Sequence, residues 1–436
     1  MKANDSLGEL TMSTWKQYIG SEKSGRALVS ALAALGLALG TAAAAPPRPT
    51  DPDEKGATRL MDRPAPERLP SETNSPVLAP LAAAWQRLSP ELLRYPTVRS
   101  NHTVNLAVHV IRPAPGKPVL VFIHGVLSDY LTWEYVAATL AADYELWLVD
   151  LPGCGDSDIP KPSTLEPDGY SPTAMGERVW QALQQCFAVE AGAAPRPVTL
   201  VAHSLGGTVA IRMLGTPDLQ VRYAAELRRI DRAVLFAPAD LAINAVPPSF
   251  LTLLGLKGWM LSVGNGLGVL DGKVRELTKA SYQVTECATI ERQRHFAHIL
   301  KDGRHRAAAQ AMLRQFTPFD PKTLRPVWPG IEPLVAEYKN IRVPVLIVHG
   351  ARDETLASAM GHQIKDQIPG AVLVKLPRRG HSLATEDPQR CANLIQRFQQ
   401  GQTPGELAAG LEGGEVFPSA VIVAPDQKAA PPAPPR

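Results

Sequence analysis

Short apolar runs alternate with helical patterns through the middle of this 436-residue chain. Six runs rich in Val, Leu, Ile and Phe have the length of strands: residues 118–124, 146–150, 198–201, 230–236, 343–349 and 371–376. Between them, apolar positions recur every three to four residues, as in 129–140 and 171–187, which predicts amphipathic helices. Strands that are apolar throughout are typical of sheets covered by helices on both faces. The pattern predicts an α/β fold with a mostly parallel, doubly wound sheet.

Two segments depart from this pattern. Residues 98–111 alternate between apolar and polar positions, which predicts a half-buried antiparallel strand. After the run that ends near Phe236, the strand pattern stops until about Tyr338. The segment 240–338 is strongly apolar at 249–270 and helical, with many Arg and His, at 282–316, so we expect a helical insertion.

The two ends of the chain differ in composition from its middle. Residues 27–45 are uncharged and Ala-rich and follow Lys16, Lys23 and Arg26, which is typical of an export signal. The same run, 27–45, is close to the length of a membrane anchor, so 1–45 is a cleaved signal peptide or a membrane tether. Either alternative predicts an exported protein, periplasmic or secreted. We expect residues 46–80 to be a disordered linker and 401–436 a disordered Ala/Pro/Gly-rich tail, leaving a body formed by 81–239 and 339–400.

Charge and motif content exclude several classes of function. The chain has 45 Lys+Arg against 42 Asp+Glu, which gives no electrostatic basis for binding nucleic acid. It has no Gly-rich phosphate loop, dinucleotide fingerprint or cluster with metal-ligand spacing, so we expect no cofactor and no metal. His295, His298 and His305 lack acidic or Cys partners at such a spacing, and a solvated basic face explains them better. The four cysteines are too far apart for a C-x-x-C motif and leave disulfide pairing open.

A serine lies at the junction of a strand and a helix. Ser204 follows the apolar run 198–201 and precedes a helical pattern that ends near Gly215. A turn this sharp needs small neighbours, and Ala202, Gly206 and Gly207 are small. The sequence therefore predicts a serine hydroxyl exposed on a strained turn.

This stretch resembles the nucleophile elbow G-x-S-x-G of the α/β-hydrolase superfamily, with Ala202 in place of the first glycine. Asp353 and His381 each follow a predicted strand, and the order Ser, Asp, His is that of the family's catalytic triad. The loop 124–127 (HGVL) is similar to the family's oxyanion loop, and the resemblance covers about residues 98–400. It implies Ser204 as nucleophile, Asp353 and His381 as its partners, the N–H groups of Val126 and Leu205 as the oxyanion hole, and 240–338 as a helical cap.

The resemblance implies a serine esterase or lipase-like hydrolase that cleaves a carboxylic ester through an acyl-enzyme. The apolar half of the cap suggests a small-molecule or lipid-like ester with an apolar acyl part. Other reactions of this fold remain open, namely carbon–carbon bond hydrolysis, acyl transfer and cofactor-free haloperoxidation, as does a non-catalytic binding module. The substrate and the oligomeric state also remain open.

Neighbouring polar residues have expected roles of their own. Asp240 also follows a strand and is an alternative acid for the triad. We expect His203 to support the turn with its side chain directed away from Ser204, and His124 to brace the oxyanion loop.

Overall fold

The computed structural model describes residues 71–112, 116–189, 196–243, 254, 274, 277–278, 280–320, 323, 325–409, 411 and 413–419. The predicted export segment 27–45 and all of the apolar stretch 249–270 except Leu254 lie outside the described residues. None of the helices in the described ranges is both long and apolar enough to cross a membrane.

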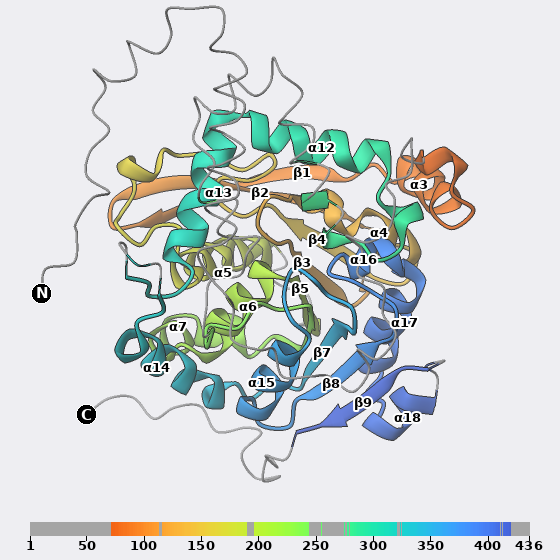
Figure 1. Ribbon diagram of the computed structural model, residues 1–436. Helices are drawn as coiled ribbons and strands as arrows, with labels where there is room; N and C mark the ends of the chain where they lie inside the picture. The colour runs from red at the N-terminus through yellow and green to blue at the C-terminus, as the bar shows by residue number, and fades with distance from the viewer. Residues whose placement is uncertain are drawn as a thin grey trace, which may run out of the picture. The chain divides into compact units, whose positions relative to one another are not determined.

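A nine-stranded sheet forms the centre of the fold, in the order β1-β2-β4-β3-β5-β6-β7-β8-β9 (Figure 1). The strands are β1 (Glu91–Arg99), β2 (His102–Ile111), β3 (Val119–Ile123), β4 (Glu145–Val149), β5 (Val198–His203), β6 (Ile230–Phe236), β7 (Val345–Gly350), β8 (Val372–Leu376) and β9 (Glu415–Pro418). The six central strands, β3 to β8, pair in parallel, whereas β1, β2 and β9 pair antiparallel with their neighbours. The predicted doubly wound, mostly parallel sheet is thus confirmed, and the six predicted runs are its six parallel strands.

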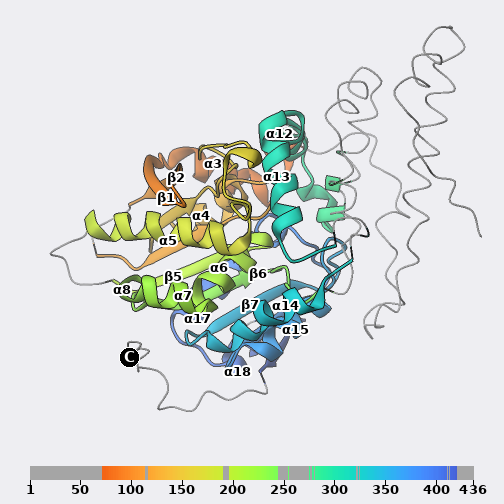
Figure 2. The ribbon, with the colours of Figure 1, turned by 90° about the vertical axis from the view of Figure 1, so that its left-hand side faces the viewer.

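Helices cover both faces of this sheet (Figures 1 and 2). One face packs against α5 (Pro172–Val189), α6 (Leu205–Gly215), α7 (Pro217–Arg222) and α15 (Ala359–Gln367). The other packs against α4 (Glu134–Leu140), α16 (Leu383–Glu386), α17 (Pro388–Gln399) and α18 (Pro404–Ala409). Successive residues of β3 alternate between the two cores, since Val121 packs toward α5 and Phe122 toward α4. Both faces of the strand are therefore buried, which is why its sequence is apolar throughout.

The chain between β6 and β7 contains the predicted helical insertion. Its described helices are η6 (Thr285–Cys287), α12 (Ile290–Lys301), α13 (Gly303–Gln315), α14 (Trp328–Ala336) and η7 (Glu337–Asn340). Figure 2 shows α12 and α13 side by side at one end of the sheet. Both begin at side-chain caps, since Thr289 accepts a hydrogen bond from the Arg292 N–H, and Asp302 accepts from the N–H groups of Arg304 and His305.

Ordered structure extends beyond both predicted ends of the body. Within the segment predicted as a linker, 46–80, residues 71–80 already contain η3 (Glu72–Asn74) and the start of α3 (Leu78–Arg87), and Leu78 is fully buried. Within the predicted tail, 401–436, α18 buries Leu407, and β9 pairs with β8. These boundaries were wrong because the segments have only a few apolar residues each, and contacts with distant parts of the chain bury Leu78, Leu407 and Leu411 among them.

The predicted strand 98–111 began too early: residues 98–99 belong to β1, and only His102–Ile111 is the strand β2, the second half of a hairpin. β1 pairs with β2 over its full length, from Glu91 opposite Val110 to Arg99 opposite His102. Ser100 and Asn101 form the turn, and both have positive φ, 46° and 65°. β1 was missed because it is an edge strand whose residues are mostly exposed.

Two 3-10 helices and one short α-helix complete the described elements. η4 (Tyr130–Trp133) begins at Asp129, whose carboxylate accepts the Leu131 N–H and caps the helix. η5 (Pro162–Thr164) and α8 (Ala224–Leu227) lie in the connections before α5 and β6.

Candidate active site

Ser204 lies at a strained turn between β5 and α6. Its φ of 54° and ψ of −122° place it outside the regions that residues with side chains normally adopt. Such a conformation costs on the order of 1–3 kcal/mol and persists only where the surroundings enforce it. Here the Ser204 N–H donates to the Phe236 carbonyl, 2.9 Å away, and its own carbonyl accepts from the N–H groups of Gly207 and Ala239.

The two glycines after Ser204 allow its turn to pack against the sheet. A Cβ on Gly206 would lie 2.3 Å from the His124 carbonyl oxygen, and one on Gly207 would lie 2.7 Å from Pro238 Cβ. Ala202, which replaces the first glycine of the motif, is a buried strand residue paired with both neighbouring strands. An alanine methyl group is therefore accommodated there, because this position precedes the turn itself.

Asp353 and His381 are brought together from the ends of β7 and β8. His381 Nδ1 lies 2.8 Å from Asp353 Oδ2, and the other carboxylate oxygen accepts the backbone N–H groups of Thr355 and Leu356 at 2.9 and 2.8 Å. Since a carboxylate can only accept, His381 carries its proton on Nδ1 and leaves Nε2 as the basic nitrogen. Gly350 allows the two loops to approach, because a Cβ there would lie 2.2 Å from the Gly380 carbonyl oxygen.

Asp353 is held in its charged form. Burial alone would raise its pKa, but the positive charge available on His381 and hydrogen bonds from His349 and His381 outweigh burial and hold the pKa well below its usual value. His349 Nε2 lies 3.3 Å from Asp353 Oδ2 and 3.1 Å from the Leu356 carbonyl oxygen. His349 thus contacts the same loop from the strand that precedes it.

His203 does not point away from the site. Its Nε2 lies 3.0 Å from the His381 carbonyl oxygen, to which it donates, and the two imidazole rings are 4.8 Å apart. Burial, with a smaller contribution from the charge of His381, lowers the pKa of His203 to about 3, so it stays neutral near pH 7. The expected direction of this side chain was wrong, because the loop of His381 reaches it from β8.

The loop after β3 approaches Ser204 closely. A Cβ on Gly125 would lie 3.0 Å from Ser204 Cβ, and the loop then turns through Leu127, which has a φ of 55°. His124 accepts the Leu151 N–H at Nε2, 3.0 Å away, and therefore donates from Nδ1 to the Gly125 carbonyl oxygen at 2.7 Å. His124 thus braces this loop, as expected.

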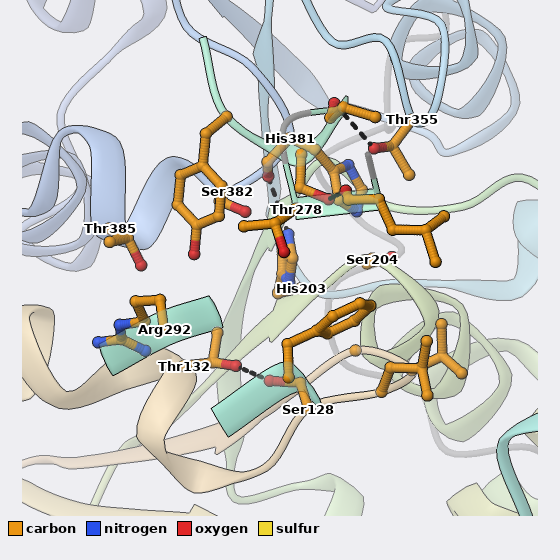
Figure 3. A pocket seen from close by; sticks show the side chains of 18 of the residues that line it. Ser128, Thr132, His203, Ser204, Thr278, Arg292, Thr355, His381, Ser382 and Thr385 are labelled. Atoms are coloured by element: carbon orange, nitrogen blue, oxygen red, sulfur yellow. Dashed lines mark hydrogen bonds between the residues drawn. The ribbon is translucent and has the colours of Figure 1, made fainter. Parts of the chain in front are cut away.

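A pocket joins these loops to the insertion (Figure 3). Figure 3 shows His203, His381 and Ser204 together in the pocket, with Arg292, Thr132 and Thr385 on another side of it. Val126 lines the pocket, and Leu205 is the first residue of α6. Apolar lining residues come from the loop after β3, from residue 277, from α12 and from α13: Val126, Leu127, Leu277, Phe296 and Leu313.

Two residues of α12 connect the insertion to the body beside this pocket. Arg292 donates to the Leu131 carbonyl oxygen at 3.1 Å, forms ion pairs with Glu134 and Glu72, and lies over the Tyr135 ring. His295 Nε2 lies 2.9 Å from Asp129 Oδ2. His295 therefore pairs with a buried carboxylate, and the solvated basic face expected for it does not describe its contacts.

Asp240 hydrogen-bonds to Tyr338 and to its own loop, whereas the carboxylate bonded to His381 is that of Asp353. Asp240 Oδ1 accepts the Tyr338 hydroxyl at 2.9 Å and the Ala242 N–H at 3.0 Å. Burial raises its pKa, in contrast to that of Asp353. The alternative acid is therefore engaged with the start and end of the insertion.

The remaining polar clusters support loops. His109, Asp150 and Asp156 could supply metal ligands by residue type, but the Asp150 Oδ2 already accepts the Asp156 N–H at 2.8 Å and contacts His109 at 3.1 Å. All four cysteines are buried, and none of them forms a disulfide. Sequence reasoning missed His349, Arg292 and Glu386. Arg292 and Glu386 contact residues more than 100 positions away, whereas His349 contacts the loop that follows its own strand.

Comparison with known proteins places this geometry in a family. A model of the alpha/beta hydrolase family matches residues 120–394, more than half of the chain. An uncharacterised protein of Mycobacterium tuberculosis is 26% identical over 327 residues, 73% of this chain and 84% of the relative. A pimeloyl-[acyl-carrier protein] methyl ester esterase of Nitrosomonas europaea is 23% identical over 291 residues, 65% of this chain and 96% of that protein.

Solved structures share the fold at low sequence identity. A putative lipase from Acinetobacter baumannii has a TM-score of 0.53 at 17% identity, covering 75% of this chain and 97% of that one. A bromoperoxidase from Bacillus anthracis has a TM-score of 0.51 at 18% identity, and the match covers 71% of this chain and 100% of that one. The matched segment runs from β3 to α17 and includes the three loops that carry Ser204, Asp353 and His381. The chain therefore belongs to the alpha/beta hydrolase family.

Proposed function

We propose that this hydrolase is a serine esterase that cleaves a carboxylic ester through an acyl-enzyme on Ser204. The observation that carries the proposal is the 2.8 Å hydrogen bond from His381 to Asp353, with His381 lining the same pocket as Ser204. A serine hydroxyl is a weak nucleophile at neutral pH and needs an adjacent base. His381, with its proton on Nδ1, can supply Nε2 as that base.

The reaction proceeds in two halves. His381 takes the Ser204 proton as the oxygen attacks the ester carbon, and then protonates the departing alcohol. Water, activated by the same imidazole, releases the acid and regenerates the serine. Asp353 holds the imidazole in one orientation and stabilises its positive charge, a role that its lowered pKa supports.

The N–H groups of Leu205 and Val126 stabilise the negative oxygen that forms during attack. Leu205 begins α6, and the first N–H groups of a helix have no acceptor within it. Gly125 brings the Val126 loop against Ser204. Each such donor contributes on the order of 3 kcal/mol in hydrolases of this type.

The substrate is an ester with an apolar acyl part, bound beneath the insertion, which acts as a cap. The apolar lining from α12, α13 and the loop after β3 supports this choice. The name of the methyl ester esterase relative and that of the structurally similar lipase also favour a carboxylic ester. A bromoperoxidase has the same fold, so the fold alone does not select ester hydrolysis over other reactions.

The decisive experiment is hydrolysis of p-nitrophenyl esters of increasing acyl length. Wild type should act on them with a preference for longer acyl chains, and Ser204→Ala should lower turnover by about 10³ to 10⁶. Ser163→Ala, at an exposed serine, is the matched control and should behave as wild type. A folded wild type without activity on any ester would overturn the proposal and favour carbon–carbon hydrolysis, acyl transfer or a binding module.

We also propose that the protein is exported, on the basis of the apolar run 27–45. Sizing the mature chain from membrane and soluble fractions tests this. A mature chain that begins near Ala45 would show cleavage and exclude the membrane tether, and a full-length chain in the cytoplasm would contradict export.

A further inference from the structure

One short segment of the insertion contacts both loops that carry the candidate triad. The Ser281 carbonyl oxygen accepts the Ser382 N–H at 3.0 Å, directly after His381. The Ala280 carbonyl oxygen accepts the Thr355 hydroxyl at 3.3 Å, two residues after Asp353. We call residues 280–284 the clasp, because they contact both the loop of Asp353 and the loop of His381.

Glu386 connects the clasp to the histidine loop. Its two carboxylate oxygens lie 3.2 and 3.0 Å from the Gly380 nitrogen, and Oε2 also accepts the Val284 N–H at 3.3 Å. The side chain is buried, and a Cβ on Gly380 would lie 2.8 Å from its Oε1. One carboxylate thus accepts from the residue before His381 and from the clasp.

We propose that Glu386 is a positioning residue that fixes His381 by anchoring its loop to the clasp. The catalytic consequence rests on the proposed function, whereas the anchoring itself does not. An amide in place of the carboxylate keeps one accepting oxygen and turns a donating NH₂ toward the other contact, and a buried N–H without an acceptor is costly. The His381 loop would then separate from residues 283–284, and the imidazole would lose its fixed position relative to Ser204.

The charge of Glu386 makes this anchor pH-dependent. Burial raises its pKa to about 7, although N–H donors from Gly380, Gln283 and Val284 and the charge of Arg379 act in the opposite direction. The other titratable groups that face it are Tyr282 and Cys287 from the insertion, Cys391 from α17 and the adjacent Asp387. Above pH 7 the carboxylate accepts from both sides, and below pH 7 its protonated form accepts less strongly.

Hydrogen exchange measures the anchor without any assumption about activity. The variants are Glu386→Gln, which keeps one accepting oxygen in place of two and loses the charge, and Glu332→Gln, an exposed glutamate on α14, as control. At pH 8, peptides covering 280–286 and 378–386 should exchange about tenfold faster in Glu386→Gln, the effect of losing one hydrogen bond to a charged group. In wild type, protection of these peptides, corrected for the intrinsic rate, should fall between pH 8 and pH 6. Exchange that is the same in wild type and Glu386→Gln, or pH-independent protection in wild type, would overturn the proposal.

Ester hydrolysis then measures the consequence for His381. At pH 8, Glu386→Gln should lower kcat about tenfold with little change in KM. As Glu386 takes up a proton below pH 7, its neutral form should resemble the variant, so the ratio of wild-type to variant kcat should fall from about ten at pH 8 toward one at pH 6. An unchanged kcat in Glu386→Gln at pH 8 would refute the positioning role. If wild type has no esterase activity, the proposed function fails, and hydrogen exchange still decides whether Glu386 anchors the loop.

Discussion

His203 Nε2 donates a hydrogen bond to the backbone carbonyl of His381, 3.0 Å away. The donor is the residue before Ser204, at the end of β5, and the acceptor lies in the loop after β8. The residue beside the candidate nucleophile therefore holds the loop of the candidate base. This contact requires a proton on His203 Nε2, and a neutral imidazole satisfies it.

Replacing His203 should change how stability depends on pH. The pKa of His203 is lowered to about 3 in the folded protein, so between about pH 6.5 and 3 the unfolded chain binds one proton more. Stability is therefore lost as pH falls through this window, at up to about 1.4 kcal/mol per pH unit from this group. In His203→Gln the free energy of unfolding, measured with urea at pH 8, 6 and 5, should fall less steeply.

Exposed His298→Gln is the control for that series and should keep the wild-type slope. Parallel curves for wild type and His203→Gln would contradict the lowered pKa.

Asparagine at position 353 should nearly abolish turnover, and asparagine at 240 should not. Asp353→Asn removes the acceptor that keeps the His381 proton on Nδ1, and the corresponding change in serine proteases costs about 10⁴ in kcat. Asp240→Asn keeps an oxygen for the Tyr338 hydroxyl and leaves the hydrogen bond between His381 and Asp353 in place. Steady-state kinetics on one ester compares the two variants. A larger loss in Asp240→Asn would reassign the acid.

Alanine should destabilise the fold at position 206 and should not destabilise it at position 405. The new Cβ at position 206 would lie 2.3 and 2.5 Å from two backbone carbonyl oxygens of β3 and its loop, which cannot move aside singly. We expect Gly206→Ala to cost about 2 kcal/mol or more of stability. Gly405 lies in α18 with nothing within 4 Å of a new Cβ, so Gly405→Ala should stabilise by about 0.5–1 kcal/mol. Thermal and urea unfolding measure both, and equal stability of the two variants would contradict the turn geometry.

Arg292 should hold α12 against the body. Arg292→Gln leaves the carboxylates of Glu134 and Glu72 without their cation, and losing one partner of a largely buried pair costs about 3 kcal/mol. Because Arg292 lines the pocket, KM for the ester should also rise. Urea unfolding and steady-state kinetics check these effects. Arg294→Gln, an exposed position on the same helix, should match wild type in both; equal behaviour of the two variants would show that the ion pairs contribute little.

The sequence by itself determined the parallel sheet and the order of its strands along the chain. β3, β5 and β7 are buried on both faces, so nearly every residue in them is apolar and the run is visible locally. The sequence also placed Ser204, Asp353 and His381 directly after strands. Parallel strands end at one edge of the sheet, so their following loops meet there.

Only the tertiary structure decided which polar groups surround these residues. His203 and His381 are 178 positions apart, and the Val284 N–H and Glu386 are 102 apart. The start of the body at residues 71–80 and the edge strand β9 likewise depend on distant partners. The spacing of apolar residues within a strand or helix shows which face of that element is buried, so it can be recognised within a single segment of the sequence. Hydrogen bonds between loops depend on where separate elements dock, so no pattern within any single segment encodes them.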